Sequence, residues 1–239
     1  MIEKLTHIGE LSGDQSPLLP LIYCDFHSCV NETDGVYIQR VDGEIPLAFS
    51  LKNSSVTLSL LSEKWDKDEF VSFVNFTHTR YVTADFKWDD TAESVCLMER
   101  CTENLISEKV TSITAQSTLN EYRNIHSLLS DEGDDFENWY ISFSGKVNSD
   151  NALAVYTEDF RSCAVCTAVF NDTGIIAGVY TNAEHRGKGY GKIAVSGLLD
   201  AMCGKGISSA LLWCEDKNIS FYEKIGFSRI GEIYYSEVI

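Results

Sequence analysis

The chain has 239 residues, of which 44 % are hydrophobic and 23 % charged, as in an ordinary globular protein that buries a core. Its 36 acidic and 19 basic residues give a net charge of −17 at pH 7. Proteins that hold nucleic-acid backbones or anionic membranes need clustered positive charge, so we expect neither partner. Only three prolines occur, at Pro17, Pro20 and Pro46, which argues against Pro-rich and collagen-like classes.

The compartment can be predicted from the N-terminus and the cysteines. No basic segment followed by an apolar one opens the chain, and no apolar run reaches the roughly 18 residues of a membrane span, so we predict a cytoplasmic protein. Two of the eight cysteines, Cys163 and Cys166, form a CxxC within an apolar strand pattern. Strand positions three apart point to opposite faces, which suits neither a shared metal nor a disulfide. We therefore favour reduced core thiols and predict no metal.

The first half predicts a small α+β domain, residues 1–108, with no catalytic spacing. Asp42-Gly43 supplies the positive φ of a tight turn, which predicts a hairpin of strands 35–41 and 45–51. An apolar stripe over 67–76, with Asp66 or Asp68 as N-cap, predicts a helix. Further strands are expected at 55–61, 81–86 and 94–99. We interpret this domain as structural or substrate-facing.

A second domain, residues 109–239, is predicted from a new pattern of alternating elements. We expect helices at 118–129, 136–147, 193–203 and 218–224, and strands at 110–115, 152–157, 163–170, 175–181, 210–214 and 228–238. The second helix carries four aromatics, which form either a core or cleft wall or a ligand cage: Phe136, Trp139, Tyr140 and Phe143. No internal repeat is visible between the two halves.

One glycine-rich loop carries the chemistry, between the strand at 175–181 and the following helix. Gly187, Gly189 and Gly191 let a ligand approach the backbone amides, which at a helix start favour phosphate oxygens. Positive charge gathers there as Arg186, Lys188 and Lys192. The spacing fits neither a nucleotide P-loop nor a dinucleotide fingerprint, so a pyrophosphate cradle of another kind is our leading hypothesis.

Two segments together resemble one known family. Arg186-Gly187-Lys188-Gly189-Tyr190-Gly191 is similar to the Arg/Gln-x-x-Gly-x-Gly/Ala motif of GCN5-related N-acetyltransferases. Phe221-Tyr222-Glu223-Lys224-Ile225-Gly226-Phe227, at the family's usual distance, resembles its second hallmark. The resemblance covers roughly 110–239. It implies a mixed α/β (α+β) fold with a central twisted mixed sheet flanked by helices, preceded, as in a bacterial branch of the family, by a smaller α+β domain.

The resemblance also implies roles for individual residues. Backbone groups of Val179, Tyr180 and Thr181 would pair with the pantetheine arm of acetyl-CoA, and the amides from Arg186 to Gly191, with Lys188, Gly189 and Tyr190 among them, would bind the pyrophosphate. Asn218 is a further cofactor-binding candidate, and Tyr222 would protonate the departing thiolate, a reasonable task for a phenol; the alternative for Tyr222 is a packed aromatic in a helix.

The sequence departs from the family at two positions. Glu215 stands where many members carry an asparagine, and the strand start 174–177 lacks the glutamate of histone-acetylating members. Candidates for the base that deprotonates the amine are Glu184, His185, Glu215 and Asp216, each of which is equally readable as surface charge. We assign none of them.

The resulting prediction is an acyl-CoA-dependent N-acetyltransferase that moves an acetyl group from acetyl-CoA to a primary amine by direct attack. The acidic balance favours a cationic small-molecule or peptide acceptor. The alternative is a catalytically idle CoA-binding or regulatory module.

Overall fold

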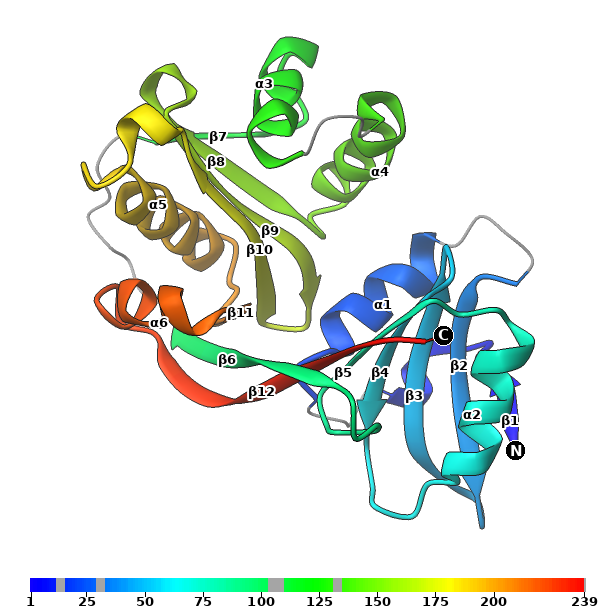
Figure 1. The fold of residues 1–239 in the computed structure, drawn as a ribbon. Helices are drawn as coiled ribbons and strands as arrows, with labels where there is room; N and C mark the ends of the chain where they lie inside the picture. Colours follow the sequence, from blue (N-terminus) through cyan, green and yellow to red (C-terminus); the bar gives the residue numbers. More distant parts are fainter. Residues whose placement is uncertain (12–15, 29–32, 103–109, 131–134, 239) are drawn as a thin grey trace. The chain divides into compact units, whose positions relative to one another are not determined.

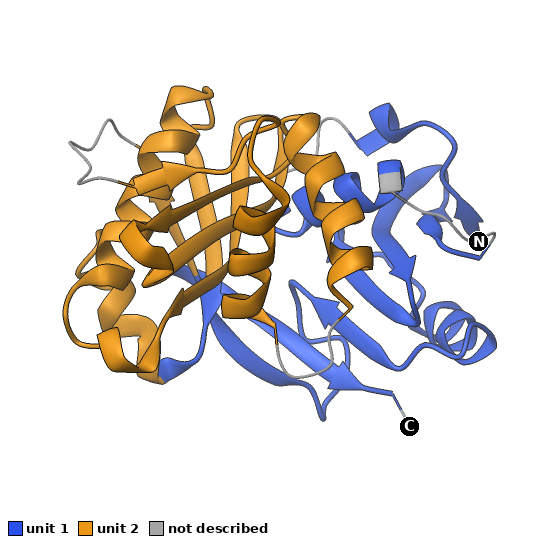
Figure 2. Ribbon diagram, turned by 90° about the horizontal axis from the view of Figure 1, so that it is seen from above, with its two compact units in different colours: residues 1–97, 213–216, 230–239 blue, residues 98–212, 217–229 orange. Residues whose placement is uncertain are grey.

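The computed structural model describes residues 1–11, 16–28, 33–102, 110–130 and 135–238, and these form two compact units (Figure 2). Unit 1 comprises residues 1–97, 213–216 and 230–239, and unit 2 comprises 98–212 and 217–229. The predicted boundary at 108/109 falls in 103–109, outside the described residues. The units instead divide at residue 97, and unit 1 also takes the C-terminal strand, because residues 234–237 pair with 81–84.

Unit 1 is a mixed sheet with helices on it (Figure 1). Its strands follow the order β1-β2-β3-β4-β5-β12, and neighbours are antiparallel except for the parallel pair β4–β5. The elements are β1 (Ile2–Lys4), the 3-10 helix η1 (Ile8–Leu11), α1 (Leu19–Ser28), β2 (Gly35–Val41), β3 (Glu44–Lys52), β4 (Ser55–Leu60), α2 (Lys67–Phe76), β5 (Tyr81–Ala84), the first part of β6 (Glu93–Cys101) and, from Ile230, β12 (Ser228–Glu237).

Local sequence explains most of these elements. Asp42 and Gly43 have φ of 51° and 85°, as the predicted hairpin turn requires. The carboxylate of Asp66 accepts the Glu69 N–H at 3.0 Å and caps α2 at its predicted start. The sequence analysis made no prediction for residues 1–34, so β1, η1 and α1 are additions.

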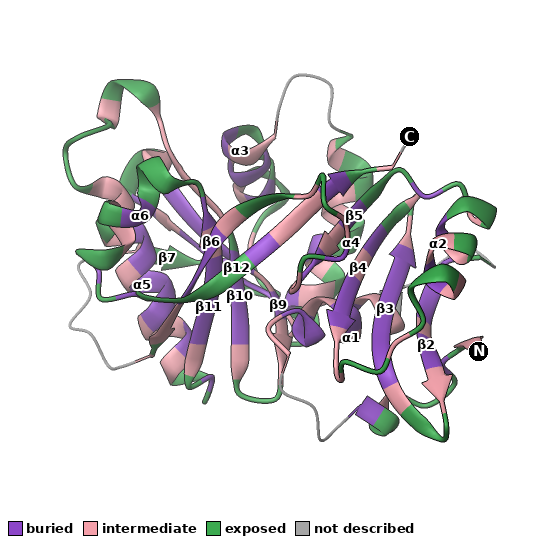
Figure 3. Ribbon diagram, turned by 60° about the horizontal axis from the view of Figure 1, so that its bottom comes forward, coloured by how far each residue is buried: buried purple, intermediate pink, exposed green. Residues whose placement is uncertain are grey.

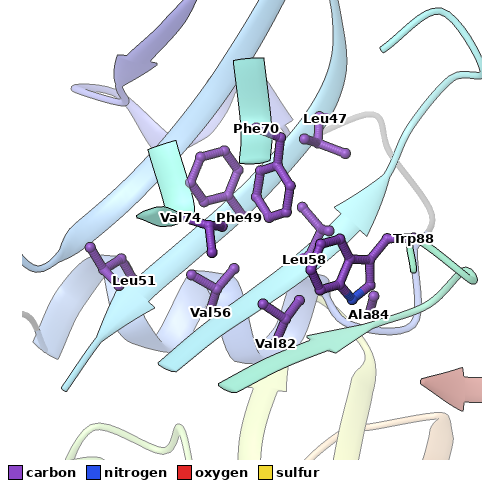
Figure 4. Packing of buried hydrophobic residues seen from close by; sticks show 10 residues of the cluster. All are labelled: Leu47, Phe49, Leu51, Val56, Leu58, Phe70, Val74, Val82, Ala84 and Trp88. Carbon is purple, nitrogen blue, oxygen red and sulfur yellow. The ribbon is translucent and has the colours of Figure 1, made fainter. Parts of the chain in front are cut away.

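The core of unit 1 lies between its sheet and α2. Leu47, Phe49 and Leu51 alternate along β3 and pack against Phe70 and Val74 of α2 (Figure 4). The intervening β3 residues are buried as well (Figure 3). They face α1, whose Asp25 accepts the Ser50 hydroxyl at 2.8 Å. Unit 1 therefore has three layers, with the sheet between α1 and α2.

The strands of unit 2 lie in the order β6-β11-β10-β9-β8-β7, with β6 belonging to it from Met98 on. β10 and β11 are parallel, and the neighbours from β10 to β7 are antiparallel. Besides β6, the elements of unit 2 are β7 (Val110–Ser112), α3 (Leu119–Leu129), α4 (Phe136–Asn148), β8 (Leu153–Thr157), η2 (Glu158–Phe160), β9 (Ser162–Phe170), β10 (Thr173–Thr181), η3 (Ala183–His185), α5 (Tyr190–Gly204), β11 (Ser209–Cys214) and α6 (Asp216–Glu223), the last two reaching into 213–216. The predicted elements are confirmed with small shifts at their ends. The largest are three residues: β7 ends at Ser112 rather than at 115, and α5 begins at Tyr190, directly on the glycine loop.

The two units repeat one topology, which the sequence analysis did not detect. In each, three antiparallel pairs are followed by one parallel pair, β4–β5 or β10–β11. A helix connects the two parallel strands, α2 in unit 1 and α5 in unit 2, and helical segments separate the first two strands. Unit 1 is therefore a second copy of the same fold rather than an unrelated domain.

The α4 aromatics and the CxxC cysteines lie in the core of unit 2. Trp139 stacks on Phe143 at 4.9 Å within the cluster that α3 and α4 form over β8 and β9, so the core interpretation is confirmed. Val165 of β9 belongs to that cluster, whereas Cys166 lies on the other face beside Met202 of α5. Because side chains alternate along a strand, Cys163 lies on the same face of β9 as Val165. Burial raises the pKa of the Cys163 thiol to about 12. Both are reduced thiols, and they lie on opposite faces of β9, as predicted.

Among the described helices, none is both long and apolar enough to cross a membrane.

Candidate functional site

The candidate site begins where two parallel strands of unit 2 part. β10 pairs with β11 only over Thr173–Ile175, opposite Ser209–Leu211, although β10 continues for six more residues. Beyond Ile175, the edge of β10 that faces away from β9 is not paired with β11. The Asn182 N–H donates to the Arg161 carbonyl at 2.9 Å, so by strand alternation Tyr180 also faces β9. Val179 and Thr181 consequently direct their N–H and C=O groups to the open edge.

A bulge bends β10 at this point. The register with β9 shifts between Ile176 and Val179, where three steps along β10 match two along β9. Gly178 within it has φ of 120°, and a Cβ there would lie 3.2 Å from Leu129 of α3. Glycine is thus needed both for the backbone conformation and for the space. The bulge turns the end of β10 away from β11 and opens the groove.

The glycine loop closes the groove at the start of α5. Gly187 and Gly189 have φ of 73° and 88°, in the left-handed region that glycine tolerates best. Gly189 is the N-cap of α5 and makes no side-chain cap, and no acidic residue stands in the first turn. The first N–H groups of a helix have no partner within it. Together with the helix dipole, they form an anion-binding end.

Gly191 is favoured by close packing rather than by its backbone conformation. Its φ is ordinary, but a Cβ there would meet the Thr181 hydroxyl at 3.2 Å and the Phe221 ring at 3.3 Å. The small residue therefore lets α5 approach both β10 and α6. This close approach brings the two sequence motifs, which begin at Arg186 and Phe221, to one groove.

The groove encloses about 650 Å³ and is formed by β10, the loop, α5 and α6. Ten of the eleven predicted site residues line it, and Lys188 does not: Val179, Tyr180, Thr181, Arg186, Gly187, Gly189, Tyr190, Gly191, Asn218 and Tyr222. Lys192, named in the sequence analysis for its positive charge, also lines the groove. The sequence analysis gave no role to Phe221, Lys224 and Ile225, which line the groove and stand in the second motif.

Two arginines hold the loop in place. The Arg186 Nε donates to the Thr181 carbonyl at 3.1 Å, and its guanidinium lies 5.6 Å from the Tyr180 ring centre. From the β8–β9 turn, Arg161 donates to the Tyr190 hydroxyl at 2.5 Å and to Asp159 at 2.9 Å, and it lies over the Tyr190 ring. These hydrogen bonds raise the pKa of the Arg161 guanidinium, so Arg161 stays charged.

Tyr222 lies in the groove wall on α6. Its ring is half-buried and contacts Phe221 at 5.0 Å and Phe227 at 5.8 Å between ring centres. Its carbonyl accepts the N–H groups of Ile225 and Phe227, which end α6 in a turn at Gly226 with φ of 97°. The backbone around this phenol is therefore fixed, which suits a group that must meet a reacting atom.

The candidate bases differ in position. His185 lines the groove, and its Nε2 lies 3.4 Å from the exposed carboxylate of Glu184. Glu215 and Asp216 are exposed and do not line the groove. Of the four, His185 is the one that the geometry brings to the site.

The part of the chain that forms this groove is similar to known proteins. The acetyltransferase (GNAT) family matches residues 115–227. Those residues form a GNAT-family acetyltransferase domain. The GNAT domain lies in unit 2 apart from 213–216, so both predicted motifs and the groove belong to it. The predicted family and its mixed α/β fold are confirmed.

Solved structures show the same fold over nearly the whole chain. A tandem GNAT protein from the clavulanic acid biosynthesis pathway is 10 % identical, with 99 % of this chain and 98 % of that one covered and a TM-score of 0.65. A GCN5-related N-acetyltransferase from Sphaerobacter thermophilus is 10 % identical, with 99 % of this chain and 95 % of that one covered and a TM-score of 0.61. A GCN5-related N-acetyltransferase from Kribbella flavida is 15 % identical, with 80 % of this chain and 85 % of that one covered and a TM-score of 0.59. The tandem relative agrees with the repeated topology of the two units.

Proposed function

We propose that unit 2 binds acetyl-CoA in this groove and transfers the acetyl group to a primary amine. The observation that carries the proposal is the open edge of β10 leading to the uncapped start of α5, with Arg186 and Lys192 beside it. A pantetheine amide chain pairs with a free strand edge as another strand would. A pyrophosphate fits the amides of a helix start, where the acidic chain gathers positive charge.

In the proposed reaction, the neutral amine nitrogen attacks the thioester carbonyl, the C–S bond breaks, and an amide forms. The departing thiolate takes a proton from the Tyr222 hydroxyl. The proton that the amine loses passes to His185 or solvent. A proton from there then returns to the Tyr222 phenolate and restores the phenol. Tyr222 contributes as a general acid, worth about 10²-fold or more in rate. Asn218 lies in the same wall and is proposed to bind the acyl donor.

The acceptor, partners and compartment remain part of the proposal. A net charge of −17 favours a cationic small-molecule or peptide amine as acceptor, and disfavours nucleic acid and anionic membrane as partners. The described cysteines are reduced thiols, which agrees with a reducing cytoplasm. The acyl donor needs no metal in this scheme.

The proposal is tested by thiol release from acetyl-CoA across a panel of primary amines. We expect turnover with at least one cationic amine and a fall in kcat of about 10²-fold in Tyr222→Phe. Tyr234→Phe is the matched control, since Tyr234 hydrogen-bonds Glu232 away from the groove and its loss should leave kcat unchanged. CoA binding without turnover on any amine would favour the idle binding module instead.

A further inference from the structure

We propose that unit 1 is a copy of the same fold whose groove is filled by its own side chains, so that the chain binds one acyl-CoA, through unit 2 alone. This inference rests on the proposed function of unit 2. The equivalence follows from topology: β4, α2 and β5 of unit 1 correspond to β10, α5 and β11 of unit 2. The groove can therefore be compared position by position.

The strand edge is the first difference. β4 pairs with β5 over Ser55–Leu58, opposite Tyr81–Ala84, and continues for only two residues beyond that pairing. In unit 2, the corresponding extension of β10 has six residues and a bulge. A pantetheine arm that pairs with backbone groups would find almost no free edge on β4.

Asp85 occupies what remains of that edge. Asp85 directly follows the last paired residue of β5. Its carboxylate accepts the Leu60 N–H at 3.0 Å and the Ser59 hydroxyl at 2.9 Å. The Ser16 hydroxyl donates to the same carboxylate. Burial raises the pKa of Asp85, as expected for a carboxyl enclosed by protein. The backbone donor that a ligand would need on β4 is thus already used.

The helix start is the second difference. α5 begins at Gly189 with no side-chain cap and no acid in its first turn. α2 begins at Asp66, whose carboxylate caps the Glu69 N–H, and Asp68 and Glu69 add two acids in the first turn. A carboxylate already stands where a phosphate would bind, and its neighbours would repel one.

The loop between strand and helix is the third difference. Residues 61–66 contain no glycine, and Trp65 packs its ring against Phe70 at 6.2 Å and Phe86 at 5.3 Å. Gln39 of β2 holds the loop further, since its side chain bonds both the N–H and the carbonyl of Asp66. In unit 1, the segment that corresponds to the glycine loop is held against the edge of the core by Trp65 and by the Gln39 side chain.

Calorimetric titration of CoA into the full chain tests this inference through its stoichiometry. The wild type should bind one CoA per chain. Gly189→Asp places at the start of α5 the carboxylate that Asp66 provides in unit 1, and should raise the Kd at least tenfold. Asp85→Asn should leave both the stoichiometry and the Kd unchanged within twofold. Thermal melting and circular dichroism confirm that each variant is folded.

Each outcome separates the two proposals. Two CoA per chain, or binding of wild-type affinity in folded Gly189→Asp, would place a site in unit 1 and overturn the inference while leaving the unit 2 enzyme intact. A changed Kd in Asp85→Asn would do the same. No binding in the wild type would refute the proposed function together with this inference.

Discussion

Gly189→Ala perturbs the backbone of the loop and little else. Gly189 has φ of 88°, and a Cβ there has no atom within 4 Å, so no steric clash contributes. An L-residue in this left-handed region costs about 1–2 kcal/mol. For a protein of 150–250 residues, each kcal/mol corresponds to about 2–4 °C in Tm, so we expect a fall of about 2–8 °C. The open space is where the phosphates are proposed to lie, so the CoA Kd should also rise severalfold.

Gly204→Ala is the matched control at the other end of α5. Gly204 is exposed, has ordinary φ, and its Cβ also meets nothing within 4 Å. Alanine is preferred over glycine in a helix by up to about 1 kcal/mol, so Tm should stay the same or rise, and the CoA Kd should not change. Thermal melting and calorimetry on both variants provide the comparison. A wild-type Tm for Gly189→Ala would refute the loop geometry, and an unchanged Kd with a lowered Tm would refute the phosphate cradle.

Three further predictions concern stability and coupling. Phe70 is fully buried, so Phe70→Ala should lower the free energy of unfolding of unit 1 by about 3–5 kcal/mol in urea denaturation. Phe76 on the same helix is 84 % exposed, and Phe76→Ala should change that free energy by no more than about 0.5 kcal/mol. Equal effects would contradict the packing of α2. The pKa of Asp85 is raised in the folded state, so its stabilising contribution is full below its unfolded pKa and is lost as pH rises through the folded pKa. Asp85→Asn should therefore gain stability relative to the wild type as pH rises from the unfolded pKa through the raised folded pKa. A pH-independent difference in urea denaturation would contradict this. Arg161→Gln should raise the CoA Kd severalfold, but have little further effect in a Tyr190→Phe background; additive effects would show that the two side chains are not coupled.

The glycine loop and the turn after Tyr222 were predictable because each depends on local sequence. The positive φ of Gly187 and Gly189 requires glycine, and the turn after Tyr222 requires Gly226, so both motifs are visible without a structure. The groove itself depends on long-range pairing. Neither the short contact of β10 with β11 nor the bulge at Gly178 leaves a periodic signal that a single sequence reveals.

The repeat was hidden for a physical reason. A fold needs only the order and the apolar faces of its strands and helices to be kept, and unit 1 keeps these while it has replaced the residues of the loop. Trp65 and Asp66 stand where a glycine loop would mark the correspondence. The composition of the compact units depends on long-range pairing as well: the last strand pairs with β5, far away in sequence, and only this pairing reveals to which unit it belongs.

The most direct measurement is a crystal structure of the chain with CoA. The account predicts one CoA per chain, with its pyrophosphate oxygens within hydrogen-bonding distance of the amides between Gly187 and Gly191, its pantetheine paired to Val179 and Thr181, and its sulfur beside the Tyr222 hydroxyl. CoA bound away from the start of α5, or a sulfur remote from Tyr222, would contradict it.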